Sequence, residues 1–271
     1  MSKEKKTINR SLQIKDITAT IKRFLCVTNQ TMGLCHCYLY KWLKVIISTG
    51  STSIDTLLFG GIRSGMVTDL YGQSGTGKSQ LCFTVCANCA EYVSREDTIM
   101  FVDTTGNFRP ERIEEIAAYK NKNKNSDNRI LNRIKYIRSF SSSEQIEAVN
   151  RITEFSARLI IIDNVSILFS DEFGGLDRHL ALMKYMHRLC LAAINFNCAI
   201  VITNMSRYAK TNDHFIEREF MGSSVSLYSH MRLKLEIIDL ERSMYKATLL
   251  QPARRQAVFF SIKSKGISDY Q

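Results

Sequence analysis

From Val45 onward, short runs of β-branched and other apolar residues alternate with longer segments in which apolar residues recur at helical spacing. This alternation is typical of βαβ units around a largely parallel sheet. It predicts strands at residues 66–71, 98–102, 134–138, 158–162 and 198–203. It predicts helices at residues 78–92, 110–119, 143–156 and 176–195. Later runs at 231–238, 246–250 and 257–262 predict hairpin strands that complete the sheet.

Two segments lack this pattern. Residues 1–45 are basic and mixed in character and too few for a second full domain, so we expect a short basic N-terminal extension followed by one core domain over residues 46–271. Residues 204–221 are polar and show no periodicity. A loop of that length in a compact domain is usually functional or disordered.

The composition limits the class of protein. A chain of 271 residues with 45% hydrophobic content can bury one large core. No apolar run reaches the roughly 18 to 20 residues that cross a bilayer, and the polar start lacks the core of a signal peptide. We therefore expect a soluble intracellular protein that has no membrane partner.

The formal charge of +11 arises from 37 Lys and Arg against 26 Asp and Glu. An excess of this sign favours a polyanionic partner such as nucleic acid. Composition drift, visible in the Lys- and Asn-rich residues 120–129, is the alternative source of the charge.

The eight cysteines are scattered and follow no secretory signal, which indicates reduced thiols. Cys82, Cys86 and Cys89 fall on one stripe of a predicted helix, where we expect them in the core. The local cluster that could hold a metal is 26–37, with Cys26, Cys35, His36 and Cys37. Because it lacks the paired C-x-x-C spacing, we do not expect a structural zinc site there.

The most informative motif is a glycine-rich turn between a predicted strand and a predicted helix. It consists of Gly72, Gln73, Ser74, Gly75, Thr76, Gly77, Lys78 and Ser79, and fits G-x-x-x-x-G-K-[ST]. Glycines allow backbone N–H groups to face phosphates, and the helix N-terminus adds its positive dipole end. Lys78 is expected to reach the β- and γ-phosphates and Ser79 to bind Mg²⁺, so the motif predicts a nucleoside triphosphate site.

A second candidate follows an aliphatic strand. Leu159 to Ile162 are all aliphatic and lead directly into Asp163. P-loop proteins place an acid beside Mg²⁺ at the C-terminal edge of such a strand. A helix cap is the alternative role for an Asp in this position, but the P-loop favours the metal site for Asp163 together with Ser79.

At this point the sequence resembles the RecA/RadA recombinase superfamily, specifically its archaeal and eukaryotic branch. The resemblance covers roughly residues 45–270 and rests on these segments: residues 47–51, residues 57–61, the P-loop, Phe101 to Thr104, Phe108-Arg109-Pro110-Glu111-Arg112, and Ile202 to Asn204. It implies an α/β fold with a RecA-like P-loop ATPase core, in which a mostly parallel twisted sheet is flanked by helices and followed by a C-terminal β-hairpin region. It also implies ATP near subunit interfaces and DNA binding through two disordered loops.

By position, the resemblance assigns further residues to the nucleotide site. Gln80 extends the P-loop set, Arg112 lies beside the adenine, and Pro252 caps the nucleotide of a neighbouring subunit. The two DNA-binding loops correspond to residues 170–178 and 206–220. Their candidate phosphate contacts are Arg178, Arg207, Lys210 and Arg218. An ordinary solvated basic loop is the alternative for the second segment.

The sequence departs from this family where catalysis is concerned. Active recombinases of this branch carry Glu where this chain has Thr105, so Lys78 and Thr105 occupy the catalytic positions without the usual general base. Losing such a base typically costs about 10²- to 10⁴-fold in rate, and hydrolysis is expected to be slow unless Glu111 or another acid substitutes. Met205 replaces the amide side chain that senses the γ-phosphate in the family.

The expected DNA and oligomer contacts also differ. The first loop is short and acidic, with Asp171 and Glu172. The N-terminal extension is too short for the family's helix-hairpin-helix domain, and residues 31–34 lack the Phe-x-x-Ala oligomerisation motif, so filaments of the usual kind are not expected.

These departures resemble recombinase paralogues such as RadB and its eukaryotic counterparts. The preferred hypothesis is an ATP- and Mg²⁺-binding repair accessory that engages single-stranded DNA or a RecA/RadA-type recombinase, as a homo- or hetero-oligomer formed through the ATP interface. We expect it in the cytoplasm with the nucleoid, or in the nucleus of a eukaryote. The alternatives are a DNA-dependent ATPase with strand-exchange activity and a KaiC-like regulatory module; residues 108–112 argue against a P-loop kinase.

Overall fold

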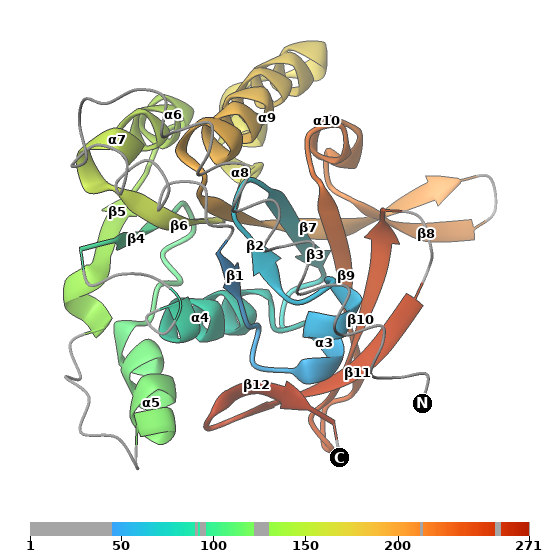
Figure 1. Ribbon diagram of the computed structural model, residues 1–271. Coiled ribbons are helices and arrows are strands. Elements are labelled where there is room, and N and C mark those ends of the chain that lie inside the picture. Colours follow the sequence, from blue (N-terminus) through green and yellow to red (C-terminus); the bar gives the residue numbers. More distant parts are fainter. Residues whose placement is uncertain are drawn as a thin grey trace, which may run out of the picture. The chain divides into compact units, whose positions relative to one another are not determined.

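The computed structural model describes residues 45–89, 92, 96–121, 130–211, 214–252 and 256–270 (Figure 1). The helices are α3 (Thr52–Leu57), α4 (Lys78–Cys89), α5 (Pro110–Asn121), the 3₁₀ turn η1 (Ile130–Arg133), α6 (Ser142–Asn150), α7 (Ile152–Phe155), α8 (Ile167–Glu172), α9 (Gly175–Phe196) and α10 (Gly222–Ser226). The strands are β1 (Ile46–Ile47), β2 (Ile62–Arg63), β3 (Val67–Gly72), β4 (Thr98–Asp103), β5 (Ile134–Arg138), β6 (Ala157–Asp163), β7 (Ala199–Thr211), β8 (His214–Glu219), β9 (Met231–Asp239), β10 (Met244–Gln251), β11 (Gln256–Lys263) and β12 (Gly266–Asp269).

The main sheet has the strand order β12-β11-β10-β9-β3-β7-β6-β4-β5. Its strands from β9 to β5 are mutually parallel, whereas β10, β11 and β12 are added in antiparallel fashion. The central strands β3, β4 and β6 are almost wholly buried, which explains the continuous apolar runs of β4 and β6. The expected α/β class, with a mostly parallel sheet and a C-terminal hairpin region, is confirmed.

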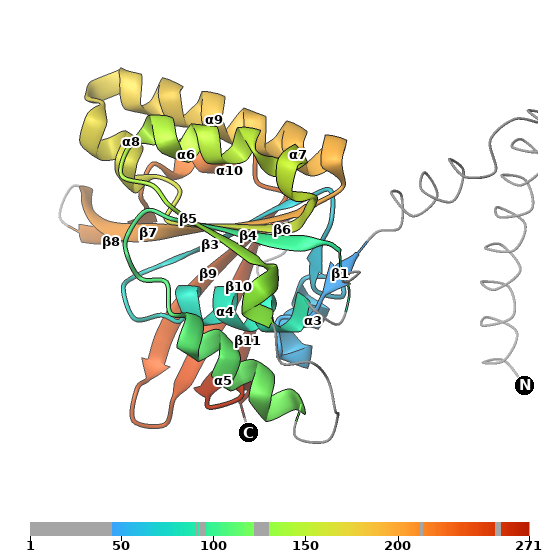
Figure 2. The same cartoon turned by 90° about the vertical axis from the view of Figure 1, so that its left-hand side faces the viewer.

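Helices cover both faces of the sheet (Figure 2). On one face, α3, α4 and α5 enclose a core that includes Leu70, Leu81 and Phe101. On the other face, α6 to α10 enclose a second core that includes Ile160, Leu189 and Ile202. Because alternate residues of a strand face opposite sides, each buried strand contributes to both cores.

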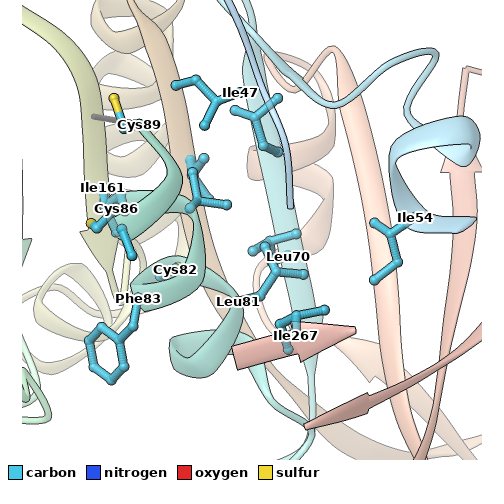
Figure 3. Packing of buried hydrophobic residues seen from close by; sticks show 14 of the residues in the cluster. Ile47, Ile54, Leu70, Leu81, Cys82, Phe83, Cys86, Cys89, Ile161 and Ile267 are labelled. Atoms are coloured by element: carbon cyan, nitrogen blue, oxygen red, sulfur yellow. The ribbon is translucent and has the colours of Figure 1, made fainter. Parts of the chain in front are cut away.

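The cysteine stripe lies in the first of these cores. Cys82, Cys86 and Cys89 are all buried on α4, in the cluster that contains Phe83 and Ile161 (Figure 3). Burial raises the pKa of each thiol, for Cys89 to about 12. The prediction that these cysteines serve as core residues is confirmed, while the cluster at residues 26–37 lies outside the described residues.

The final strand is joined to the start of the core. Asp269 Oδ1 accepts hydrogen bonds from Ser51 Oγ at 2.5 Å and from the Ser53 amide at 2.9 Å. In β12, the Ile267 amide donates to Thr84 Oγ1 of α4 at 3.1 Å. The strand β12 thus holds both the N-terminus of α3 and the helix that follows the P-loop.

Three expectations about local structure were wrong. The helix expected at 143–156 is divided at Arg151, whose φ of −80° and ψ of 4° end the helical path and let the chain turn towards β6. Residues 204–221 are largely a hairpin of β7 and β8, because the two polar segments satisfy each other's backbone groups. Residues 170–178 mostly belong to α8 and α9.

Two further expectations concern the N-terminal extension and membrane-spanning helices. The basic extension at 1–45 lies almost entirely outside the described residues, so the proposed division of the chain stays a prediction. Within the described ranges, no helix is long and apolar enough to cross a bilayer.

Candidate nucleotide-binding site

The P-loop joins the end of β3 to the start of α4, and its glycines are required by the space around them. A Cβ on Gly72 would lie 2.2 Å from the carbonyl oxygen of Leu235, which is far inside contact distance. Gly75 and Gly77 have φ values of +80° and +92°, a region that L-residues rarely adopt. The loop can therefore keep this path only with glycine at these positions.

Lys78 lies over the loop that precedes it. Its Nζ donates to the carbonyl oxygens of Gly72 at 2.8 Å and Gln73 at 2.6 Å. Burial lowers the pKa of Lys78, although nearby Asp163 acts in the opposite direction. A partly buried ammonium that contacts neutral carbonyls is stabilised more strongly by an anionic partner than a fully solvated ammonium is. The side chain is therefore well placed to bind phosphate.

Two oxygen ligands converge beside Lys78. Ser79 Oγ donates to Asp163 Oδ2 at 2.6 Å, and Thr203 Oγ1 donates to Asp163 Oδ1 at 2.5 Å. Burial raises the pKa of Asp163, and the hydrogen bonds from Ser79 and Thr203 oppose this rise. A hydroxyl and a carboxylate oxygen at such close approach are the hard ligands that Mg²⁺ prefers, so the residues present fit this ion.

Thr203 was not among the predicted site residues. It follows Ile202 on β7, and Ile202 pairs with Ile162 on β6, so Thr203 lies beside Asp163, the last residue of β6. The available signal was a hydroxyl residue directly after the aliphatic run of residues 200–202. Thr203 orients the carboxylate of Asp163.

A cleft of about 810 Å³ surrounds these groups, within the usual range for small-molecule sites. The predicted residues that line it are Ser74, Gly75, Gly77, Lys78, Ser79, Gln80, Thr105, Arg112 and Asp163. The lining also includes residues that were not predicted: Asn107, Asn164, Ser206, Tyr245 and Ile262. The structure thus brings most of the predicted nucleotide site together in one place.

Arg112 is fixed at the rim of this cleft. Its Nε donates to Gln80 Oε1 at 2.9 Å, and its Nη atoms donate to the carbonyl oxygens of Lys263 and Ser264 at 2.5 and 3.0 Å. The ring of Phe108 stacks on Tyr136 with centroids 4.6 Å apart, which anchors the start of α5. Stacking of Arg112 on a base stays a prediction. Pro252 does not line this cleft, and its role towards a neighbouring subunit also stays a prediction.

Thr105, at the position expected to hold a catalytic Glu, contacts the buried carboxylate of Asp103. Thr105 donates to Asp103 Oδ1 from its amide at 2.9 Å and from Oγ1 at 3.3 Å. Burial favours a raised pKa for Asp103, but amide N–H groups of residues 105, 106 and 108 lower it overall. Glu111 is exposed on α5 and does not line the cleft. Among the described residues that line the cleft, Asp163 is the single carboxylate.

Comparison with known proteins decides the family. The sequence model of the Rad51 family matches residues 41–270 of this chain. The chain belongs to the Rad51 family. This agrees with the resemblance to the RecA/RadA superfamily that the P-loop and residues 108–112 indicated.

Several named relatives share this region with the Rad51-family chain. It is 33% identical over 171 residues to the DNA repair protein rhp51 of Schizosaccharomyces pombe. This alignment covers 59% of the chain and 46% of rhp51. It is 33% identical over 171 residues to the DNA repair protein RAD51 of Saccharomyces cerevisiae, covering 59% and 42%. It is 35% identical over 170 residues to the DNA repair and recombination protein RadA of Cenarchaeum symbiosum, covering 59% and 42%. The matched stretch spans less than half the length of these three relatives.

The candidate DNA-binding residues of this Rad51-family chain lie on regular elements. Arg207 on β7 and Arg218 on β8 are exposed and face each other directly across the hairpin. Lys210 belongs to β7, and its side chain lies outside the described residues. Arg178 is in the first turn of α9 and is partly buried, so it is not on a disordered loop.

A buried ion cluster joins the hairpin to the P-loop strand in this Rad51-family chain. Arg232 on β9 binds Asp69 on β3, with Nε and Oδ2 3.2 Å apart, and its Nη2 binds Glu219 Oε2 on β8. Burial raises the pKa of both carboxyls, while Arg232 lowers them. Sequence analysis missed this cluster because its members lie on separate strands.

Proposed function

We propose that this Rad51-family chain binds ATP with Mg²⁺, hydrolyses it slowly, and acts in recombinational DNA repair as an accessory paralogue. The observation that carries the proposal is the cleft itself. Lys78, Ser79 and Asp163 all line it, and Ser79 donates a hydrogen bond to Asp163, but no second carboxylate is present among its described lining residues.

The phosphate-binding role follows from the P-loop. Its turn and the N-terminus of α4 direct backbone N–H groups and a positive dipole end towards the cleft. Lys78 supplies a charge, and Ser79 and Asp163 would hold Mg²⁺. When bound there, the ion would neutralise phosphate charge. Arg112 and Gln80 border the part of the cleft in which a base would lie.

Slow turnover follows from the groups near position 105. The hydroxyl of Thr105 cannot take a proton from water at neutral pH, and it is already engaged with Asp103. Asp163 is committed to Ser79 and Thr203. ATP would then act chiefly as a conformational ligand.

The partner proposal rests on charge and on the named relatives, which are DNA repair proteins. The chain carries a formal charge of +11, and Arg218 is exposed on a hairpin that begins at the edge of the cleft. We propose single-stranded DNA and a RecA/RadA-type recombinase as partners, with homo- or hetero-oligomers formed through the ATP interface. The location would be the nucleus, or the nucleoid of a cell without one.

The test is ATP binding and ATP turnover by the purified protein, with and without single-stranded DNA, at two salt concentrations. We expect tight binding, negligible turnover, and DNA affinity that falls steeply with salt because bound phosphates release counterions. Brisk DNA-stimulated turnover would instead support the strand-exchange ATPase. Absence of salt-dependent DNA binding would favour a regulatory module of the KaiC kind.

Restoring a carboxylate at position 105 is expected to increase turnover. Thr105→Glu should raise the rate by at least about 10-fold, because a well-placed general base contributes about 10²- to 10⁴-fold and this one would be imperfectly aligned. Phosphate release measures the rate. Thr105→Gln, which has the same length but no basic oxygen, is the matched control, and equal rates in the two variants would contradict the explanation for slow turnover.

A further inference from the structure

One row of side chains on β7 follows the face of the sheet that carries the P-loop helix. Ala199 and Val201 pack in the same core as α4, and Thr203 contacts Asp163. Because alternate residues of a strand point to the same side, Met205 and Arg207 continue this row. Both of them line the P-loop cleft.

Strand pairing places Arg207 immediately past the P-loop strand. Gly72, the last residue of β3, pairs with Met205, so Arg207 is one step further along the same face, where β3 has already turned into the loop. In that position Arg207 borders the same cleft as Lys78 and Ser79. Arg218, its partner across the hairpin, does not line the cleft.

Neighbouring contacts hold this part of the hairpin beside the P-loop. The guanidinium of Arg207 lies 4.0 Å from the ring centroid of Phe220. Tyr208 OH accepts a hydrogen bond from Gln73 Nε2, within the P-loop, at 2.8 Å. A stacked guanidinium loses little freedom when it binds a second group with its edge.

The charge of Arg207 is not neutralised within the hairpin. No carboxylate forms an ion pair with it among the residues that the structure describes, and the residue directly opposite is a second arginine. Such a cation at the edge of a phosphate-binding cleft attracts an anion, and a guanidinium can bind phosphate with two parallel hydrogen bonds.

We propose that Arg207 binds the terminal phosphate of a nucleoside triphosphate held by the P-loop of the same chain, and so discriminates ATP from ADP. This inference rests on the proposed ATP-binding function. Arg207 would make the contact with the γ-phosphate that the side chain of Met205 cannot make. Arg207 would then no longer be a candidate DNA contact. Because Arg207 is part of β7, the hairpin would be held more firmly against the P-loop with ATP than with ADP.

The experiment is titration of the full chain with ATP and with ADP in the presence of Mg²⁺, followed by fluorescence or calorimetry. Arg207→Ala should weaken ATP binding by about 10- to 100-fold and ADP binding by less than about 3-fold, since only ATP carries the contacted phosphate. Arg207→Lys should lie between the wild type and Arg207→Ala. Arg218→Ala removes the same charge from the same hairpin outside the cleft, and should change neither affinity by more than about 3-fold.

A second readout is independent of affinity. Limited proteolysis of the hairpin should be slower with ATP than with ADP in the wild type and equal in Arg207→Ala. Melting temperatures measured without nucleotide show whether each variant is folded.

The outcomes distinguish failure of the Arg207 inference from failure of the proposed ATP binding. If the wild type binds ATP through Lys78 and Arg207→Ala keeps the wild-type ratio of ATP to ADP affinity, this inference alone is overturned. An equal loss of ATP and ADP affinity would also overturn it. If the wild type binds neither nucleotide, the proposed function itself fails.

Discussion

Arg232→Met is expected to reduce the free energy of unfolding by about 3 to 5 kcal/mol. The substitution removes the cation that lies between Asp69 and Glu219 and leaves two carboxylates in the interior. Asp69 is 0% exposed, so water cannot replace the lost partner. Chemical denaturation followed by circular dichroism measures the change.

The pH dependence of this variant gives a second check. Burial raises the pKa of both Asp69 and Glu219, so their ionised forms cost stability at a pH above these raised values. Without Arg232 the cost increases, and protonation at lower pH relieves it. The difference between wild type and Arg232→Met should therefore shrink as the pH falls from 8 towards the raised pKa values.

Arg242→Met is the matched control. Arg242 also pairs with an aspartate, with Nε and Asp239 Oδ2 3.6 Å apart, but its side chain is 77% exposed. Exposed pairs contribute at most about 1 kcal/mol, so this variant should be nearly as stable as the wild type. Equal losses in Arg232→Met and Arg242→Met would show that the buried cluster does not tie β8 and β9 to the P-loop strand.

Lys78→Ala is expected to weaken ATP binding by about 100-fold or more. The variant loses Lys78, the single lysine among the described residues that line the cleft, and each charge-assisted hydrogen bond to phosphate contributes about 1.5 to 3 kcal/mol. Gln73, one of the two residues whose carbonyl oxygens Lys78 contacts, is exposed, so water can replace the ammonium there and the fold should be preserved.

Thermal melting gives a direct measurement. A nucleotide at about 100 times its dissociation constant stabilises the folded protein by about 2.7 kcal/mol, which is about 5 to 10 °C for a domain of this size. The wild type should show this shift with ATP and Mg²⁺, and Lys78→Ala should not. Lys184→Ala, at an exposed position on α9, serves as the control and should keep the shift. An undiminished shift in Lys78→Ala would place the nucleotide outside the P-loop.

Local sequence signals were sufficient to predict which residues come together in the candidate nucleotide site. Gly72, Gly75 and Gly77 impose a backbone path, and the buried aliphatic strand that ends in Asp163 places this carboxylate at the C-terminal edge of the parallel sheet. Because these constraints act over a few residues each, the approach of Ser79 to Asp163 could be inferred from the chain before its geometry was known.

The hairpin could not be predicted in the same way. Its strands are mostly polar, and Phe215 and Ile216 are adjacent in sequence, so hydrophobic alternation, the main signal for a strand, is missing. Asn212 and Asp213, which favour turns, were the remaining local indication. The cluster of Asp69, Glu219 and Arg232 depends on pairing between strands that are distant in sequence, and no local pattern reports such pairing.

The contact of Asp269 with Ser51 and Ser53 has a consequence for biosynthesis. Ser51 and Asp269 are separated by 218 positions in the sequence. Nearly the whole core must therefore be synthesised before the N-terminus of α3 can bind Asp269. Contacts of such long range slow folding, because the loop between them must close first. The P-loop helix, which β12 also contacts, would therefore reach its final packing only after β12 has been synthesised, and the candidate nucleotide site would be completed no earlier.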